Sequence, residues 1–490
     1  MKIYLLLFFI LISIPGFGQI RMTLGEAIRL AADSSLTAFK AQNLYLASYW
    51  QYRTFVAQKK PLVSLNTNLI DFNNSMTEVY NSVLQINEYT HIQDISSGAN
   101  ASVRQNLPFS GGTLYFDSEL NRVQNFGRTE STQYSTVPIR VGLNQPVYGY
   151  NTFKWQKKIE PLKYEKAKKS YLQTVENISS NMVDNFFNLL TARMKVSMSA
   201  TNVANADTLY IIGQKRLEIA SLSLADVLTL RVDALNARNN LEEAKKGLKN
   251  AQYVFNSYLR LREDFQTELE IPENLPVFQV NYEEVLQQAQ NNNPDLLGYQ
   301  QQVLESASDL ERAKHQNLFN ATLNASFGLN QQNSSIQGAY HNPMDQQRAS
   351  VSLSIPIIDW GQSRGKVNMA RKNYEVTKIT VEQAKVDFRQ QVMMAVTNFN
   401  MQMNIVKSAE ETRKVAQQAY EINKQRFVIG KTDVNSLGLA LNRQDQATVN
   451  YLNALRDYWK YYYTLRQITL YDFEHRKGLE RNFDEGMGVN

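Results

Sequence analysis

The chain has 490 residues, no cysteine and a formal net charge of +6, with 52 Lys and Arg against 46 Asp and Glu. The absence of cysteine excludes disulfides, thiol chemistry and lipid attachment through a cysteine. The positive charges are spread along the chain and form no basic stripe, which argues against nucleic-acid binding.

Residues 1–18 predict a secretory signal peptide. Lys2 precedes an apolar run from Ile3 to Ile14, which ends in a Pro–Gly break and small residues, so cleavage is expected before Gln19. The run is short for a membrane span, and no later stretch has about 18 uninterrupted apolar residues. We therefore expect an exported chain whose residence in a membrane, if any, depends on β-strands.

Helical and strand segments then alternate. Residues 19–61 predict a helix that opens with the capping-box pair Thr23 and Glu26 and stops at Pro61. The segments after it are predicted as strands with an insertion at 62–148, a long helical hairpin at 149–265, a linker and helix at 266–318, strands at 319–358, a second long hairpin at 359–473 and a tail at 474–490.

The second hairpin has the clearest helical signal. There is no Gly and no Pro from Lys366 to Ile429, which predicts a helix of about 95 Å. Gly430 ends it and a helix returns from Thr432, while the first hairpin is expected to turn near Ala220. Apolar residues three and four apart, with polar residues elsewhere, indicate coiled-coil packing along a narrow stripe.

The strand segments alternate between apolar and small polar residues. In 321–329 and 350–355 every second residue is apolar, 63–69 and 137–144 follow the same rule, and 99–107 and 112–120 alternate as well. This pattern fits a membrane barrel with lipid outside and water inside, and it fits a half-buried soluble sheet equally well. Export and the long hairpins favour the barrel, whose strands must close between subunits because two strand pairs are too few to close alone.

The chain contains a tandem duplication. VGLNQP (141–146) matches VSLSIP (351–356) at an offset of about 210 residues, and LGEAIRLA (24–31) resembles YEEVLQQA (282–289) at about 258. The first copy therefore holds about 48 extra residues, which we place in Phe72–Val103. A polar loop that includes Gln85–Asp94 is the preferred interpretation, with an added hairpin as the alternative.

Two motifs identify a family resemblance. Each strand segment ends in a proline before the helix, as LNQPVYGYN (143–151) and LSIPIIDWGQ (353–362), and each hairpin tip carries a related motif, RLEIASLSLADVL (216–228) and RFVIGKTDVNSL (426–437). On these motifs the chain resembles the TolC family of bacterial outer-membrane efflux channels over nearly its whole length. It departs from the family pattern at Ala220, Asn151 and Ser436.

The resemblance implies a mixed α and β membrane protein that forms a homotrimer in the outer membrane. Four strands per subunit would build a 12-stranded β-barrel, and the helices would build a coiled-coil tunnel through the periplasm. The protein would be the passive exit duct of a tripartite efflux or export system, with a periplasmic adaptor and an inner-membrane pump as partners and no cofactor.

The resemblance also implies that the tips gate the duct and contact the adaptor. The positions concerned are Arg216, Ala220, Asp226, Arg426, Gly430, Asp433 and Ser436. Asp226 matches the family's acidic ring, whereas Ser436 stands at the second acidic position. Asp433 is expected either to line the constriction or simply to cap the returning helix, and the two arginines either to bind a partner or to have no special role.

Nothing in the sequence favours an enzyme or a metal site. The four histidines lie at no ligand spacing, and no nucleotide or nucleophile motif occurs in a usable context. A periplasmic coiled-coil adaptor or scaffold without a pore is the alternative function, and it would carry a compact soluble β-domain. A diffusion porin is a third, which the long hairpins disfavour.

Overall fold

The computed structural model describes residues 20–81, 85–126, 130–317 and 319–480. The predicted signal peptide lies outside the described residues, as does the end of the predicted tail. The chain divides into two compact units, one of residues 1–45, 168–294 and 387–490, the other of residues 46–167 and 295–386. No helix in the described residues is long and apolar enough to cross a lipid bilayer.

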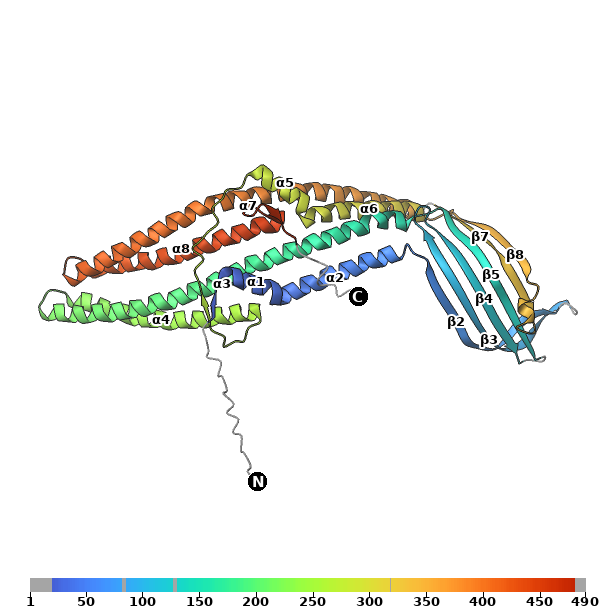
Figure 1. Cartoon of the computed structure of the whole chain (residues 1–490), viewed down its shortest axis with the longest axis horizontal. Helices are drawn as coiled ribbons and strands as arrows, with labels where there is room; N and C mark the ends of the chain where they lie inside the picture. The colour runs from blue at the N-terminus through green and yellow to red at the C-terminus, as the bar shows by residue number, and fades with distance from the viewer. Residues whose placement is uncertain (1–19, 82–84, 127–129, 318, 481–490) are drawn as a thin grey trace, which may run out of the picture. The chain divides into compact units, whose positions relative to one another are not determined.

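The two long hairpins are copies of one another (Figure 1). Helices α3 (Thr152–Glu218) and α7 (Gln362–Val428) each have 67 residues, and α4 (Leu224–Leu259) and α8 (Val434–Thr469) each have 36. In both pairs the second copy begins and ends 210 residues after the first. The predicted hairpins and the duplication are thereby confirmed.

The shorter helices are also duplicated, but each predicted helix is two. The helix predicted within 19–61 is divided into α1 (Leu24–Ser34) and α2 (Leu36–Ala57). The helix predicted within 266–318 is divided into α5 (Tyr282–Asn292) and α6 (Pro294–Asn317). The breaks have local causes, because Ser35 is extended and its hydroxyl accepts from the Ala38 amide, while Asn293 precedes a proline. The predicted capping box of Thr23 and Glu26 is present.

The second unit contains one antiparallel sheet. Its strands are β2 (Leu62–Asn81), β3 (Ile86–Leu107), β4 (Gly112–Asn125), β5 (Ser131–Tyr148), β7 (Asn320–Asn333) and β8 (Met344–Ser354). They lie in the order β2-β3-β4-β5-β7-β8, as Figure 1 shows, so β2 and β8 are the edges. Within the described sheet, β5–β7 is the pair that joins the two copies.

The sheet corrects the predicted strand number. It has six strands instead of four, and the extra residues are not a loop but lengthen β2 and add most of β3 and β4. In the segment expected to be a loop, Tyr89 pairs with Glu78 and His91 with Met76. The apolar residues of this segment, Ile86, Tyr89 and Ile92, lie three apart, so it lacks the alternation by which a strand is predicted.

The two faces of the sheet differ in chemistry. The strand register places on one face Val63, Leu65, Val103, Phe116, Val141, Leu143, Phe327, Val351 and Leu353. On the other face, hydrogen bonds between side chains join neighbouring strands. Ser64 bonds Ser102 at 2.9 Å, and Asp117 accepts from Asn100 at 3.2 Å and pairs with Arg140. The predicted alternation of apolar and polar residues is therefore the sheet's main feature.

Short elements complete the first unit. Strand β1 (Ile20–Met22) pairs in parallel with β6 (Thr267–Leu269), and β9 (Tyr471–Asp472) pairs antiparallel with β10 (Lys477–Gly478). The C-terminal segment is held to the helices by Arg466, which donates two bonds to Glu176 at 2.8 and 3.0 Å and pairs with Asp472. All three side chains are largely buried, so this network fixes where α8 ends.

Spin labels on adjacent residues of β3 test the two faces. In protein reconstituted into lipid vesicles, a label on Ala101→Cys should be relaxed by oxygen dissolved in lipid, and one on Asn100→Cys by a water-soluble nickel complex. The chain has no cysteine of its own, so each label is unique. Equal responses of the two labels, or water exposure of both, would show that β3 is not part of a membrane wall.

Candidate functional site at the hairpin tips

Both tips turn with the same backbone geometry. Ala220 and Gly430 have positive φ, 55° and 75°. The next amide in each turn donates to the carbonyl of the tip arginine at 2.8 Å, from Ser221 to Arg216 and from Lys431 to Arg426. This is the Schellman arrangement that ends a helix with one left-handed residue. Ala220 therefore occupies a conformation that favours glycine.

A serine and an aspartate cap the returning helix at both tips, but they exchange positions between the two tips. In the first tip the Asp226 amide donates to the Ser223 hydroxyl at 3.1 Å, and that hydroxyl donates to the Asp226 carboxylate at 2.6 Å. In the second, the Ser436 amide and hydroxyl donate to the Asp433 carboxylate at 2.8 and 2.7 Å. Each tip therefore keeps one carboxylate, three positions apart along the helix.

Asp433 is the N-cap of α8, as one of the two sequence interpretations held. The bonds from the amide and hydroxyl of Ser436 lower its pKa. The cap therefore contributes stability at pH values above the ordinary 3.8, and this contribution is lost as pH falls through the lower folded-state pKa. Asp226 lies in the first turn of α4, where a carboxylate is also favourable.

The two arginines have different surroundings. Arg216 donates to the Phe427 carbonyl of the other hairpin at 3.2 Å, and its guanidinium lies 5.5 Å from the centre of the Phe427 ring. It also donates to Ser221 at 3.3 Å, and Arg426 repeats this bond with Lys431 at 3.4 Å. Among the described residues, Arg216 thus joins the two hairpins, while Arg426 is exposed.

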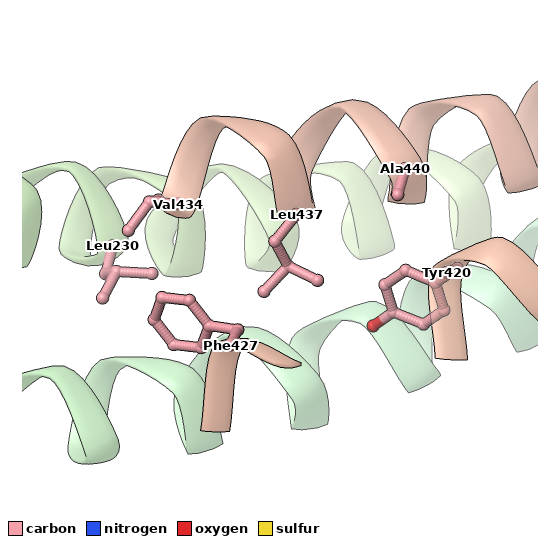
Figure 2. Close-up of a cluster of buried hydrophobic side chains, with 6 residues drawn as sticks. All are labelled: Leu230, Tyr420, Phe427, Val434, Leu437 and Ala440. Carbon is pink, nitrogen blue, oxygen red and sulfur yellow. The ribbon is translucent and has the colours of Figure 1, made fainter. Parts of the chain in front are cut away.

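Below the tips the hairpins share a small apolar core. Figure 2 shows its six buried side chains, which come from α4, α7 and α8: Leu230, Tyr420, Phe427, Val434, Leu437 and Ala440. Phe427 has no exposed surface, and burial raises the pKa of Tyr420 to about 12. Because Arg216 bonds the backbone of Phe427, the core and the polar contact hold the same point of the second tip.

A groove of about 1110 Å³, lined by both polar and apolar side chains, follows the core along α3, α4 and α8. Two hydrogen bonds cross between the hairpins here, from Asn202 to Asp445 at 2.8 Å and from Lys424 to Asn205 at 2.9 Å. Burial raises the pKa of Asp445, and the bond from Asn202 offsets this only in part. None of these four residues stood out in the sequence, because a polar residue on a long helix is usually solvated.

One group of side chains has the composition of a metal site. Ligand atoms of Asp472, Glu474 and His475 lie within 4.8 Å of one another. Asp472 already accepts from Arg466 and from the amides of Glu474 and His475, so its carboxylate is in use. We assign the group to the buried network that holds the C-terminal segment.

Known proteins resemble this chain in sequence and fold. The sequence profile of the outer membrane efflux protein family matches residues 99–254 and 285–469. An uncharacterized protein of Haemophilus influenzae is 23% identical over 245 residues, 50% of this chain and 53% of that protein. The match thus spans about half the length of this curated relative.

Several solved outer-membrane channels share the fold. The CmeC channel of Campylobacter jejuni superposes with a TM-score of 0.67 over 95% of this chain and 88% of its own, at 13% identity. VceC of Vibrio cholerae gives 0.61 over 93% and 97%, also at 13% identity. OprN, an outer-membrane channel, gives 0.63 over 91% and 89% at the same identity.

The left-handed residues predict opposite effects at the two tips. Ala220→Gly should stabilise the first tip by about 0.5–1 kcal/mol, because it removes the side chain from a left-handed position. Gly430→Ala should destabilise the second, since its Cβ would also lie 3.3 Å from Nη2 of Arg216. Hydrogen exchange of the tip amides measures both. The control is Ala225→Gly, inside α4, which should lower protection. If Ala220→Gly lowered the protection of the tip amides, the backbone of Ala220 would not be strained.

Asp445 predicts a pH dependence of the contact between hairpins. Because its folded-state pKa is raised above 3.8, the stability that its protonated form contributes is lost as pH rises through that pKa. Asp445→Asn should therefore protect the amides around Asn202 more strongly at pH 7 and reduce their dependence on pH. Hydrogen exchange, corrected for intrinsic rates, makes the comparison. Asp457→Asn on the same helix is the control. An equal gain in amide protection around Asn202 in this control would show that the effect does not come from Asp445.

Proposed function

This chain belongs to the outer membrane efflux protein family, and we propose on that premise that three copies form the exit duct of an efflux or export system. Family membership confirms the resemblance found in the sequence and places the protein in the bacterial outer membrane. The proposed duct is passive and has no cofactor. The observation that carries it is one sheet with an apolar and a polar face, joined to two copies of a long helical hairpin.

The trimer is proposed because the sheet is incomplete. In lipid every backbone N–H and C=O needs a partner, so only helices and closed barrels span a bilayer. Six strands with unpaired edges at β2 and β8 do not meet this requirement alone. Closure with further copies satisfies both edges, and the family supports three as the number.

The gate is proposed to lie at the tips. Three copies would arrange Asp226 and Asp433 as rings of carboxylates, which attract cations and narrow the entrance by their size. Arg216 and the apolar core would hold the hairpins of one copy together in the closed state. Opening would then require the loss of the bond from Arg216 to Phe427.

The partners proposed are a periplasmic adaptor and an inner-membrane pump. The groove of α3, α4 and α8 has a mixed polar and apolar lining, on which a helical hairpin of an adaptor can lie. An alternative role as a scaffold without a pore would leave the apolar face of the sheet in water. The chain exposes Leu65, Val351 and Leu353 on this face, which favours contact with lipid.

Single-channel recording in planar bilayers tests the duct. The purified protein should give discrete openings of small conductance, because the closed tips limit the current. Arg216→Ala should raise the conductance several-fold by freeing the second hairpin from the first.

Lys431→Ala is the matched control, since it removes one positive charge from a tip without breaking a bond between hairpins. Wild-type conductance is expected for it. A protein that inserts into bilayers and gives no discrete conductance, with or without Arg216→Ala, would refute the proposed function.

A further inference from the structure

The chain itself contains a template for the contact between copies. Strand β5, the last of the first repeat, pairs with β7, the first of the second, and places Val141 opposite Phe327 and Leu143 opposite Ala325. The end of the second repeat and the start of the first have no such partner in the described sheet, where they form the edges β8 and β2. Duplicated sequences predict that these edges can form the same pair.

The template fixes a register. Residues of β8 lie 210 positions after their counterparts in β5, and residues of β2 lie 258 positions before theirs in β7, as the matching starts of β2 and β7 show. Applied to the β5–β7 pair, these offsets place Val351 opposite Leu69 and Leu353 opposite Thr67. The two strands run antiparallel, because the sheet alternates in direction across all its strands from β2 to β8.

Strand β8 ends early on its unpaired side. Its counterpart β5 continues to Tyr148, which corresponds to Ile358, whereas β8 stops at Ser354. The apolar residues that follow are Ile355, Ile357 and Ile358, with exposed fractions of 57%, 92% and 73%. A neighbouring β2 would extend β8 through them and cover these side chains.

A helix contact accompanies the strand pair in the template. Tyr150, just after β5, hydrogen-bonds the hydroxyl of Ser308 on α6, and the Arg312 guanidinium lies 4.9 Å from the centre of its ring. The counterpart of Tyr150 is Trp360, which is 96% exposed. A tryptophan this exposed is unusual on a soluble surface, and it indicates a binding partner.

The receiving surface on α2 is also available. The counterparts of Ser308 and Arg312 are Trp50 and Thr54, and Trp50 is 57% exposed. The other face of α2 is occupied within the chain, where Tyr52 stacks on Tyr164 of α3 at 4.9 Å. In a contact between copies built on this template, two tryptophans would stand where Tyr150 and Ser308 meet within the chain.

The ion pair of the template is not conserved in the second contact. Lys154 binds Glu311 at 3.1 Å, but their counterparts are Arg364 and Arg53. The contact between copies must therefore depend on backbone pairing and apolar packing.

We propose that β8 of one copy pairs with β2 of the next in the register that places Leu353 opposite Thr67, while Trp360 packs on Trp50 of that copy. All six strands then lie between the joined edges, so three copies close a barrel of eighteen strands, not twelve. Barrels of this size leave an aqueous channel. The proposal rests on the proposed trimer and adds its register, its helix contact and its width.

Disulfide cross-linking in the cysteine-free chain tests the register. Leu353→Cys with Thr67→Cys should give covalent trimers on oxidation in outer membranes. Leu353→Cys with Asn68→Cys is the control, because a shift of one residue turns the second thiol to the opposite face. Efficient bridging of the control, or none of the predicted pair, would overturn the register.

The mass of the unmodified protein in detergent separates this proposal from the proposed function. A trimer without the predicted cross-link refutes the edge pairing alone, whereas a monomer refutes the trimer itself.

Trp360→Ala tests the helix contact. It should weaken the trimer about tenfold, measured as the concentration at which the trimer dissociates. Phe109→Ala, which removes a ring of 83% exposure from the turn between β3 and β4, should leave the trimer unchanged. Equal stability of the two variants would refute the contact between Trp360 and α2.

Discussion

The structure depends on one constraint, the hydrogen bonding of a backbone in lipid. A sheet that enters a bilayer must pair every strand, and this chain pairs all but the outer sides of β2 and β8. The duplication supplies the remedy, because the pair formed inside the chain by β5 and β7 can be formed again between copies. The exposed isoleucines after β8 and the exposed Trp360 become understandable as parts of that second pair.

The two repeats are alike in backbone and different in detail. The long helices match in length and in the geometry of their turns, yet one tip uses alanine where the other uses glycine. The cap exchanges serine and aspartate between two positions and so keeps its hydrogen bonds while moving the carboxylate. Arg216 joins the hairpins and Arg426 does not, which gives the tips different roles in one copy.

Much of the fold could be predicted because its signals are local. Helices without Gly or Pro, Gly430 at a turn and the alternation around Val351 each report on their own conformation. Parts of β3 and β4 could be predicted from the alternation in 99–107 and 112–120, whereas the paired extension around Tyr89 and His91 was expected to be a loop because its apolar residues do not alternate. The contacts of Asn202 with Asp445 depend on the packing of distant helices, which no single segment encodes. The reversed cap of Asp433 was visible in the sequence, but only the turn geometry shows that it replaces Ser223.

The central claim is that three copies close a single wall with six strands from each. A cryo-electron microscopy map of the detergent-purified protein, viewed along the symmetry axis, tests it most directly. The account predicts threefold symmetry and eighteen strands in one closed ring, with β2 next to β8 of the neighbouring copy. A ring of twelve strands that leaves β3 and β4 outside the wall, or separate six-stranded sheets, would contradict it.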